Sequence, residues 1–348
     1  MELSVVIPTR NRPESLLRLL RSLLNQSFPL KEVIIVDSSD SPFDAKQFTP
    51  FKSLNIRYLN SSPSVCAQRN LGIRLASSEN VFLCDDDIEL TSDYLGILCE
   101  FLAAHPEEGA ACGVILEPEG ENSQSNEFPS ISFSHLLWRF VFQLGVFADL
   151  RKTRAHFVFA PFLSLLRAFY RHRGNTFTFA GWPLVTQVNR PWFKTALSAL
   201  GCSVVKRDWL LNSPFNERLD PSGIGDNYGV AIGFPGKQPI TIMTSASVIH
   251  HRSPLNRSAI PLAYFRRILA LDYFMSQSRR FHSLQRIFLC WSLAGNLLAQ
   301  LMRGELKMAG ATFKAFGVIA QNGSPYTRAF VKEEKGSISP ELTLDSER

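Results

Sequence analysis

The chain has 348 residues, of which 45% are hydrophobic and 20% charged, and its formal net charge is +6. These numbers allow a sizeable core in one large domain or two ordinary ones. The longest apolar segment without a charge, 287–302, is shorter than the roughly 20 residues that cross a bilayer. A spanning helix is therefore not expected.

The cysteines are scattered through apolar runs, and no two of them form a C-x-x-C pair. This pattern predicts buried free thiols in a reducing compartment. The N-terminus begins directly with the apolar run 3–8, so we expect no signal peptide. The sequence thus predicts a cytoplasmic protein.

The first 116 residues alternate apolar strand-like runs with helical patterns. Runs such as 3–8 and 32–37 lack polar alternation, as strands covered on both faces do, and the segment 13–26 has leucines on one helical face. Such a series predicts an α/β fold: an open, mostly parallel, Rossmann-like sheet with helices on both faces. We expect residues 1–116 to form one β/α half of the protein, which the resemblance described below implies is the nucleotide-sugar-binding half.

Polar side chains follow the carboxyl ends of the predicted strands, where ligands bind in sheets of this kind. They are Pro8, Thr9 and Arg10 after the first strand, Asp37 after the second, and Asp85, Asp86 and Asp87 after the fourth. Neither common glycine-rich phosphate loop occurs in the sequence. If the rim binds a nucleotide, a divalent cation held by these carboxylates is the obvious group to bind its phosphates in place of such a loop.

Three adjacent carboxylates are costly unless a positive group joins them. Mn²⁺ and Mg²⁺ prefer oxygen ligands and commonly combine one or two carboxylates with substrate phosphate oxygens. In an extended chain Asp85 and Asp87 would point to one side and Asp86 to the other. The alternative is a polar loop whose aspartates cap the next helix.

The ordered motifs SVVIPTRNRPESLLRLLRSLLNQ, EVIIVDSSD, AQRNLGI and FLCDDDI resemble the nucleotide-binding half of family 2 glycosyltransferases of the GT-A fold. The resemblance covers roughly residues 1–116. It implies an inverting, metal-dependent glycosyltransferase that uses a nucleotide-diphosphate sugar, with a UDP-sugar as the expected donor. The expected acceptor is a saccharide or lipid-linked molecule in cell-surface polysaccharide synthesis.

The resemblance also implies roles for individual residues. Pro8 and Thr9, with Arg10 beside them, match the loop at the nucleotide, Asp37 matches the aspartate at the base, and Arg69 matches a basic residue near base and diphosphate. Asp85 and Asp87 match the ends of the D-x-D signature, with Asp87 the stronger metal ligand, and Asp86 is expected at the ribose. For Arg69, the alternative is an arginine on a helix surface.

From residue 117 the regular alternation breaks. We expect residues 117–180 to form an inserted loop and a basic, aromatic helical region that serves as a lid or a membrane contact. Between 136 and 175 there are seven basic residues and one acid. Basic and aromatic residues together favour an anionic membrane surface, whereas the alternative is a core helix below a solvated basic face. No nucleic-acid motif is visible, so nucleic acid is not an expected partner.

Residues 181–257 are expected to form the acceptor-binding half with the catalytic base. Gly201 and Arg207 match markers of its first segment, and Asp226 matches the base that takes a proton from the acceptor hydroxyl. The family usually has Glu-Asp where this chain has Gly225-Asp226, so the first acid of the pair is missing. The alternative for Asp226 is an ordinary turn aspartate.

The apolar strand pattern at 240–249 is followed by two histidines. The resemblance implies that a histidine here reaches the metal or the diphosphate, and His250 is a better match than His251. A histidine at a strand end is otherwise more often structural. Arg252 and Arg257 could close over phosphates.

Residues 258–330 read as two or three amphipathic helices with basic faces, which suit peripheral attachment to the inner face of the cytoplasmic membrane. The tail 331–348 is polar and expected to be disordered. Two other functions remain open. The missing acid before Asp226 fits a non-catalytic sugar-nucleotide-binding protein, and a nucleotidyltransferase is a further alternative that lacks its usual glycine-rich loop.

Overall fold

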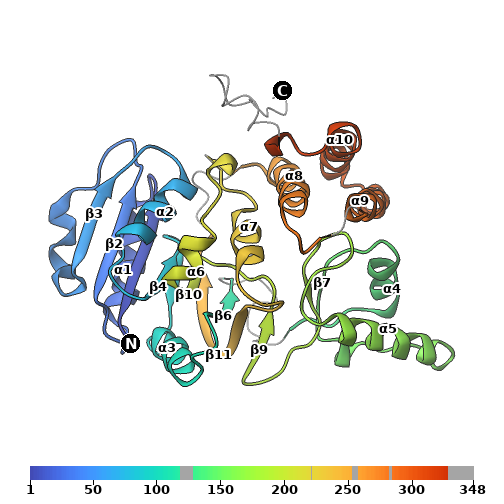
Figure 1. The fold of residues 1–348 in the computed structure, drawn as a ribbon, viewed down its shortest axis with the longest axis horizontal. Coiled ribbons are helices and arrows are strands. Elements are labelled where there is room, and N and C mark those ends of the chain that lie inside the picture. The colour runs from blue at the N-terminus through green and yellow to red at the C-terminus, as the bar shows by residue number, and fades with distance from the viewer. Residues whose placement is uncertain (118–127, 221, 253–257, 282–283, 328–348) are drawn as a thin grey trace.

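The computed structural model describes residues 1–117, 128–220, 222–252, 258–281 and 284–327. Its centre is a nine-stranded sheet in the order β3-β2-β1-β4-β10-β6-β11-β5, with β9 paired to β11. Figure 1 shows the N-terminal strands at one side, helices α4 and α5 at the other, and α8 to α10 along one edge. The predicted α/β architecture with C-terminal helices is confirmed.

The N-terminal part of the sheet is parallel, as the apolar runs predict. Its strands are β1 (Leu3–Thr9), β2 (Glu32–Asp37), β3 (Ile56–Asn60) and β4 (Asn80–Cys84). Every residue of β1 and β2 is buried, which requires cover on both faces. The register pairs Thr9 with Asp37, so the polar ends of these two strands lie side by side.

Helix α2 (Val65–Leu75) packs against β1 and β2, and the buried leucines of α1 (Pro13–Leu24) belong to the same core. Proline at the first position of α1 fits the helix start, and leucines at helical spacing are buried on one face. Ser64 caps α2 by accepting from the Ala67 N–H at 3.1 Å. Gly72 allows α2 to approach β1 closely, because a Cβ there would lie 2.4 Å from a methyl of Val6.

The remaining strands combine distant parts of the chain in the same sheet. They are β5 (Ile88–Leu90), β6 (Ala110–Leu116), β9 (Trp192–Thr195), β10 (Cys202–Lys206) and β11 (Ile240–His250). Strand β10 lies antiparallel between β4 and β6, which therefore do not pair with one another. Strand β11 then runs parallel to β6 and brings His250 to the rim beside β5.

Short helices support this second part of the sheet. They are α3 (Tyr94–Ala104), α6 (Arg207–Asn212) and α7 (Asp226–Gly233), with 3₁₀ turns at Ala45–Leu54, Leu150–Lys152, Phe157–Phe159 and Glu217–Leu219. Arg207 donates from its guanidinium to the carbonyls of Ile73 and Arg74 at 2.9 and 2.8 Å. This predicted marker therefore satisfies the C-terminal carbonyls of α2.

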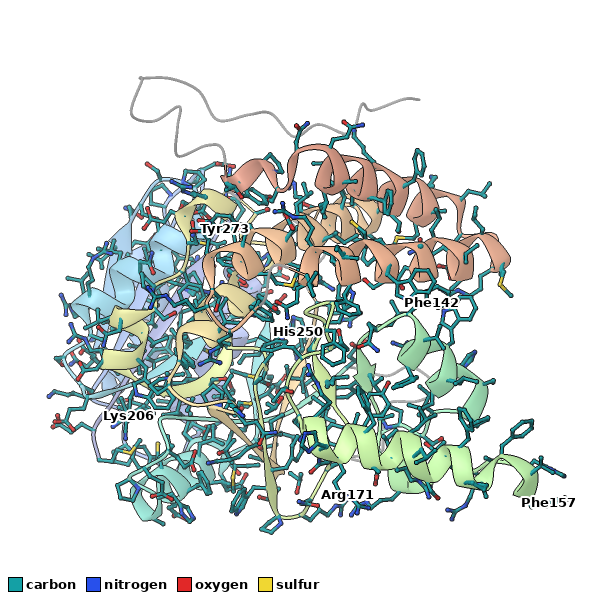
Figure 2. All side chains as sticks on the ribbon, turned by 45° about the vertical axis from the view of Figure 1, so that its right-hand side comes forward. Phe142, Phe157, Arg171, Lys206, His250 and Tyr273 are labelled. Carbon is teal, nitrogen blue, oxygen red and sulfur yellow. The ribbon has the colours of Figure 1, made fainter. Side chains whose placement is uncertain are left out.

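The region after β6 contains α4 (Phe133–Val141), β7 (Val146–Phe147), α5 (Ala160–Arg173) and β8 (Leu184–Val185). It has a small core of its own around Leu136, Leu166 and Tyr170. Figure 2 shows Phe157 at the far end of α5, away from the sheet. Phe142 stacks on Trp291 of α9 with ring centroids 4.9 Å apart, which ties this region to the C-terminal helices.

The C-terminal helices are α8 (Ile260–Gln277), α9 (Gln285–Met302) and α10 (Leu306–Asn322). The prediction of amphipathic surface helices is wrong for α8, because the helix is buried nearly all round from Ile268 to Met275. Its buried Asp272 accepts from both Arg286 of α9 and the Ser324 backbone. Among the described residues, no helix combines the length and apolarity that crossing a bilayer requires.

The six cysteines all lie in described residues, and none of them forms a disulfide. Cys290 is half-buried and the other five are buried, as the sequence predicts. Burial raises the pKa of each buried thiol, so these groups stay protonated and serve as small apolar side chains. The tail 331–348 and Arg257 lie outside the described residues.

Candidate active site

The rim of the sheet is organised by hydrogen bonds between the ends of β1, β2 and β4. The Thr9 hydroxyl donates to Asp86 at 2.7 Å. Gln68 of α2 donates to the carbonyls of Thr9 and Val36 at 2.9 and 2.6 Å, which fixes the two strand ends against the helix. The candidate nucleotide-binding residues at the ends of β1 and β2 are therefore held in position by hydrogen bonds to α2.

Asp86 and Asp87 share one cation, Arg12. The Arg12 guanidinium lies 2.9 Å from Asp86 and 3.7 Å from Asp87, and both carboxylates are 4% exposed. Burial raises the pKa of Asp86 to about 6, although the charge of Arg12 acts in the opposite direction. Arg12 was not predicted as a site residue, and its position shortly after the first strand is the only signal for it in the sequence.

The expectation that Asp85 and Asp87 point to one side and Asp86 to the other assumed an extended chain. The chain instead turns at residues 86 and 87. Asp87 then joins Asp86 at Arg12, while Asp85 contacts Arg69 at 2.6 Å. The alternation of a strand does not apply within a turn, so the three carboxylates divide differently from the prediction.

His250 is the histidine that reaches this cluster. Its Nε2 lies 3.2 Å from Asp87, whereas His251 contacts Glu89 at 2.8 Å. Two of the three predicted metal ligands, Asp87 and His250, thus lie together, and Asp85 is engaged elsewhere. No group of three or more His, Cys, Asp or Glu side chains is placed to hold a metal in the part of the chain that the structure describes.

A second cluster joins α2 to the start of α7. The Arg69 guanidinium forms ion pairs with both Asp226 and Asp85. The Asp85 N–H donates to the Gly201 carbonyl at 2.8 Å. A Cβ at Gly201 would lie 2.2 Å from the Asp85 carboxyl group, so only glycine leaves this side chain its place.

Asp226 is buried at the first position of α7 and accepts from the Asn227 N–H at 2.6 Å. Burial raises the pKa of Asp226, and the charge of Arg69 offsets part of that rise. The preceding Gly225 has φ of 95°, and a Cβ there would lie 2.6 Å from Ala270. A glutamate at position 225 would therefore be strained in this backbone and would crowd Ala270.

Other predicted nucleotide contacts lie at the same rim with partners of their own. Asp37 is buried, and its oxygens accept from the Ser39 hydroxyl and N–H and from Tyr58 at 2.5 to 2.8 Å. Pro8 is buried within β1. Arg10 lies 3.3 Å from Asp40 at the surface. Arg252 pairs with Glu117, near the end of β6.

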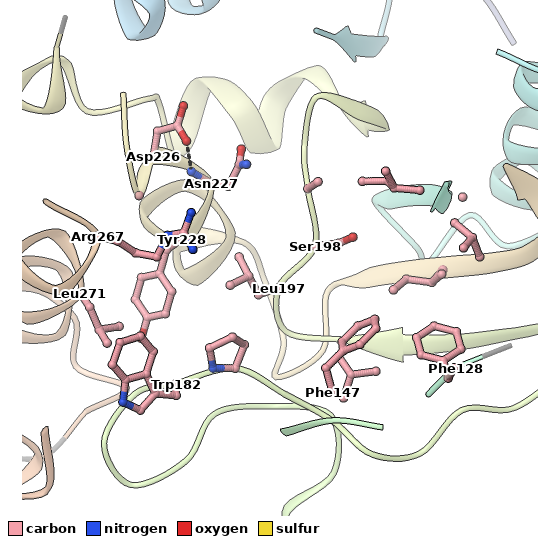
Figure 3. A pocket seen from close by; sticks show the side chains of 18 of the residues that line it. Phe128, Phe147, Trp182, Leu197, Ser198, Asp226, Asn227, Tyr228, Arg267 and Leu271 are labelled. Carbon is pink, nitrogen blue, oxygen red and sulfur yellow. Dashed lines mark hydrogen bonds between the residues drawn. The ribbon is translucent and has the colours of Figure 1, made fainter. Parts of the chain in front are cut away.

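A cavity of about 660 Å³ lies on the other side of Asp226. Figure 3 shows Asp226, Asn227 and Tyr228 of α7 on one side of the cavity, with Trp182 next to Tyr228, and Phe147 and Phe128 on the other side. Sequence periodicity could not find this cavity, because its walls come from β6, β8, α7 and α8. Asp226 thus belongs both to the ion-pair cluster around Arg69 and to the lining of this cavity.

Comparisons with known proteins agree with this architecture. Residues 4–172 match the family model "Glycosyl transferase family 2". An uncharacterized glycosyltransferase, YwdF of Bacillus subtilis, is 34% identical over 96 residues, which are 27% of this chain and 36% of YwdF. A putative colanic acid biosynthesis glycosyl transferase, WcaA of Escherichia coli, is 32% identical over 99 residues, 27% of this chain and 36% of WcaA. The match therefore spans about a third of the length of these relatives.

A solved structure shares the fold over most of the chain. S. aureus TarS 1–349 superimposes with a TM-score of 0.51 at 14% identity, covering 91% of this chain and 81% of TarS 1–349. A complex of the same protein with UDP-GlcNAc gives a TM-score of 0.51 at 13% identity, with 91% and 82% covered. Residues 4–172, which contain Asp85, Asp86 and Asp87, thus match glycosyl transferase family 2 in sequence.

Proposed function

We propose that the chain transfers a sugar from a nucleotide-diphosphate donor, with UDP as the expected nucleotide, to an acceptor hydroxyl with inversion at the anomeric carbon. The observation that carries this proposal is the position of Asp226. Its carboxylate forms an ion pair with Arg69, and Asp226 is also one of the residues that line the 660 Å³ cavity. A donor at the rim and an acceptor in the cavity would meet at Asp226. The TarS complex with UDP-GlcNAc, on a similar fold, supports a nucleotide-sugar donor.

In this reaction the acceptor oxygen forms a bond to the anomeric carbon as the bond from that carbon to the diphosphate breaks. The diphosphate leaves with the electron pair, and Asp226 takes the proton of the acceptor hydroxyl. The raised pKa of Asp226 suits this role, because a stronger base accepts a proton more readily. Arg69 lies where it can contact the leaving diphosphate.

The residues present fit Mn²⁺ or Mg²⁺ held jointly with the substrate. Asp87 and His250 lie 3.2 Å apart at the rim and offer one oxygen and one nitrogen donor, and diphosphate oxygens would complete the coordination. When bound, the ion would stabilise the negative charge that develops on the diphosphate. Arg12, which contacts Asp86 and Asp87, supplies a positive charge from the protein itself.

Peripheral attachment to the inner face of the cytoplasmic membrane is part of the proposal. The segment leading into α5 exposes Phe157, Val158, Phe159 and Phe162, and basic residues follow at the end of the helix. The exposed fraction of Phe157 is 77%, although its ring centroid lies 4.4 Å from that of His156, and exposed apolar side chains that cluster in this way mark a protein or membrane contact. Aromatic side chains beside basic ones are typical of segments that lie in a lipid interface.

Replacing Asp226 by Asn tests the proposal directly. The amide keeps the shape of the side chain but cannot take the proton, so we expect kcat to fall by about 10² to 10⁴. Calorimetry with UDP and Mn²⁺ should give a Kd close to that of the unaltered protein. A loss of UDP binding in the variant would indicate a structural role for Asp226 instead.

The products distinguish the two alternative functions. A sugar-nucleotide-binding protein without activity would bind UDP and Mn²⁺ but release nothing across a panel of donors and acceptors. The glycine at 225, which replaces the usual acid, is the observation that favours this candidate. A nucleotidyltransferase would release pyrophosphate, whereas the proposed reaction releases a nucleoside diphosphate.

A further inference from the structure

A second cavity lies next to the one beside Asp226. A cavity of about 440 Å³ shares four wall residues with the first: Phe147, Trp182, Pro183 and Val185. Its other walls include Arg139 of α4, Tyr264 of α8 and Asn296 of α9. The two cavities are therefore neighbours on either side of these four residues, and the second one reaches the C-terminal helices α8 and α9.

The walls around Asp226 are largely apolar. The polar tips of the two largest aromatic residues point to partners in the protein, because Trp182 donates to Ser292 at 2.8 Å and Tyr228 donates to the Gly181 carbonyl at 3.1 Å. A ligand in the cavity thus meets their rings. Figure 3 shows Leu197, Leu271 and Phe147 on the same walls, and the polar groups are concentrated at Asp226, Asn227, Ser198 and Arg267.

This lining discriminates between two kinds of acceptor. A sugar has hydroxyl groups on every face, and each one buried against apolar walls without a partner costs about 1 to 3 kcal/mol. An alkyl chain has no such groups and gains about 25 cal/mol for each Å² of apolar surface removed from water. The polar residues beside Asp226 suit a hydroxyl, and the four residues shared by the two cavities suit hydrocarbon, while Arg139 and Asn296 are polar residues at the far side of the second cavity.

We propose that the acceptor is amphipathic: its hydroxyl-bearing head lies beside Asp226, and an apolar chain runs past Phe147 and Trp182 into the second cavity. This inference rests on the proposed function and narrows the acceptor to molecules that carry a hydrocarbon chain. Phe147, in β7, stands at the junction of the two cavities and is 59% exposed. It is the specificity-determining residue of this arrangement.

Binding of octyl and methyl β-glucosides, below the micelle concentration, tests the inference with the full-length chain. We expect calorimetry to give a Kd for the octyl glucoside at least tenfold lower than for the methyl glucoside, with a negative heat-capacity change. Phe147→Asp should reduce this ratio to near one, because it places a charge at the junction. The exposure of Phe147 makes the substitution compatible with folding.

Phe157→Asp is the matched control, since Phe157 is also exposed and belongs to the same inserted region but lines neither cavity. It should keep the octyl preference. Equal affinities for the two glucosides in the unaltered protein would overturn the inference, and so would an equal loss in both variants. Binding of UDP and Mn²⁺, measured on the same samples, separates the outcomes: its absence in the unaltered protein would contradict the proposed function itself.

Discussion

The guanidinium of Arg69 forms a buried ion pair with the carboxylate of Asp226, although 157 residues separate them in the chain. The same guanidinium contacts Asp85 at 2.6 Å. One cation thus connects the acid at the end of β4 with the acid that lines the cavity. Removing the charge of Arg69 should therefore change the pKa of Asp226, the proposed base.

The pH dependence of sugar transfer should reveal how Arg69 affects the ionisation of Asp226. Burial raises the pKa of Asp226 above the ordinary 3.8, and Arg69 lowers it in part. Since the base acts in its ionised form, kcat/KM should rise with pH as the pH passes through the raised pKa. In Arg69→Gln the lowering charge is lost, so we expect this rise to move by about one pH unit or more to higher pH. Profiles of kcat/KM from pH 4 to 9 measure it.

Arg69→Lys is the control for that experiment, because lysine keeps the positive charge but loses the fork that spans both carboxylates. Its activity should fall while the rise in its profile stays close to that of the unaltered protein. A profile that does not move in Arg69→Gln would mean that Asp226 is not the group whose ionisation limits the reaction.

Replacing Asp87 should weaken the response of sugar transfer to Mn²⁺, whereas replacing other acids at the rim should not. Replacing it by Asn removes the charge beside His250, so the Mn²⁺ concentration that gives half-maximal transfer should rise by tenfold or more. Asp40→Asn is a suitable control, because Asp40 is an acid at the same rim that pairs with Arg10 at the surface. Full activity of the unaltered protein in EDTA, or equal metal dependence in both variants, would contradict the proposed ligand role.

Much of the parallel half could be predicted because its signals are local. Apolar runs identified β1, β2 and β4, and the rule that ligands lie at the carboxyl ends of strands identified the acidic rim. The resemblance selected Asp226 and Arg69, but local pattern could not show that they pair. Their contact depends on how α7 is placed against α2, which the spacing of residues does not encode.

The second half resisted prediction because its contacts are non-local. The segment marked by Gly201 and Arg207 is predicted to begin the acceptor-binding half, and the structure shows that it forms β10 between β4 and β6, a position that no local pattern indicates. Strand pairing over such separations follows from the competition among all apolar segments for places in the sheet. The burial of α8 was missed for a related reason, since a helix packed on several sides has no single apolar stripe.

Gly201→Ala should test whether Asp85 contributes to nucleotide binding. The added methyl would lie 2.2 Å from the Asp85 carboxyl, so Asp85 must leave its contact with Arg69. We expect the Kd for UDP with Mn²⁺ to rise by about tenfold, which corresponds to about 1.4 kcal/mol. Gly310→Ala is the control: Gly310 lies in α10 with open space around it, so alanine should leave UDP binding unchanged and favour the helix. A fall in Tm for Gly201→Ala with unaltered UDP affinity would place Asp85 outside the nucleotide site.

Membrane attachment should depend on the exposed aromatic residues at the start of α5. Phe157→Asp with Phe162→Asp removes two phenylalanines that are 77% and 55% exposed and adds two negative charges. Vesicles with equal amounts of phosphatidylglycerol and phosphatidylcholine should float the unaltered protein at low salt, and the double variant should bind at least tenfold more weakly. Leu24→Asp, at an exposed leucine at the end of α1, provides the control and should float like the unaltered protein.

Since surface charge is screened by salt, 0.5 M NaCl should weaken but not abolish flotation if the phenylalanines insert. Equal flotation of the double variant and the unaltered protein would assign the exposed aromatic residues to another partner.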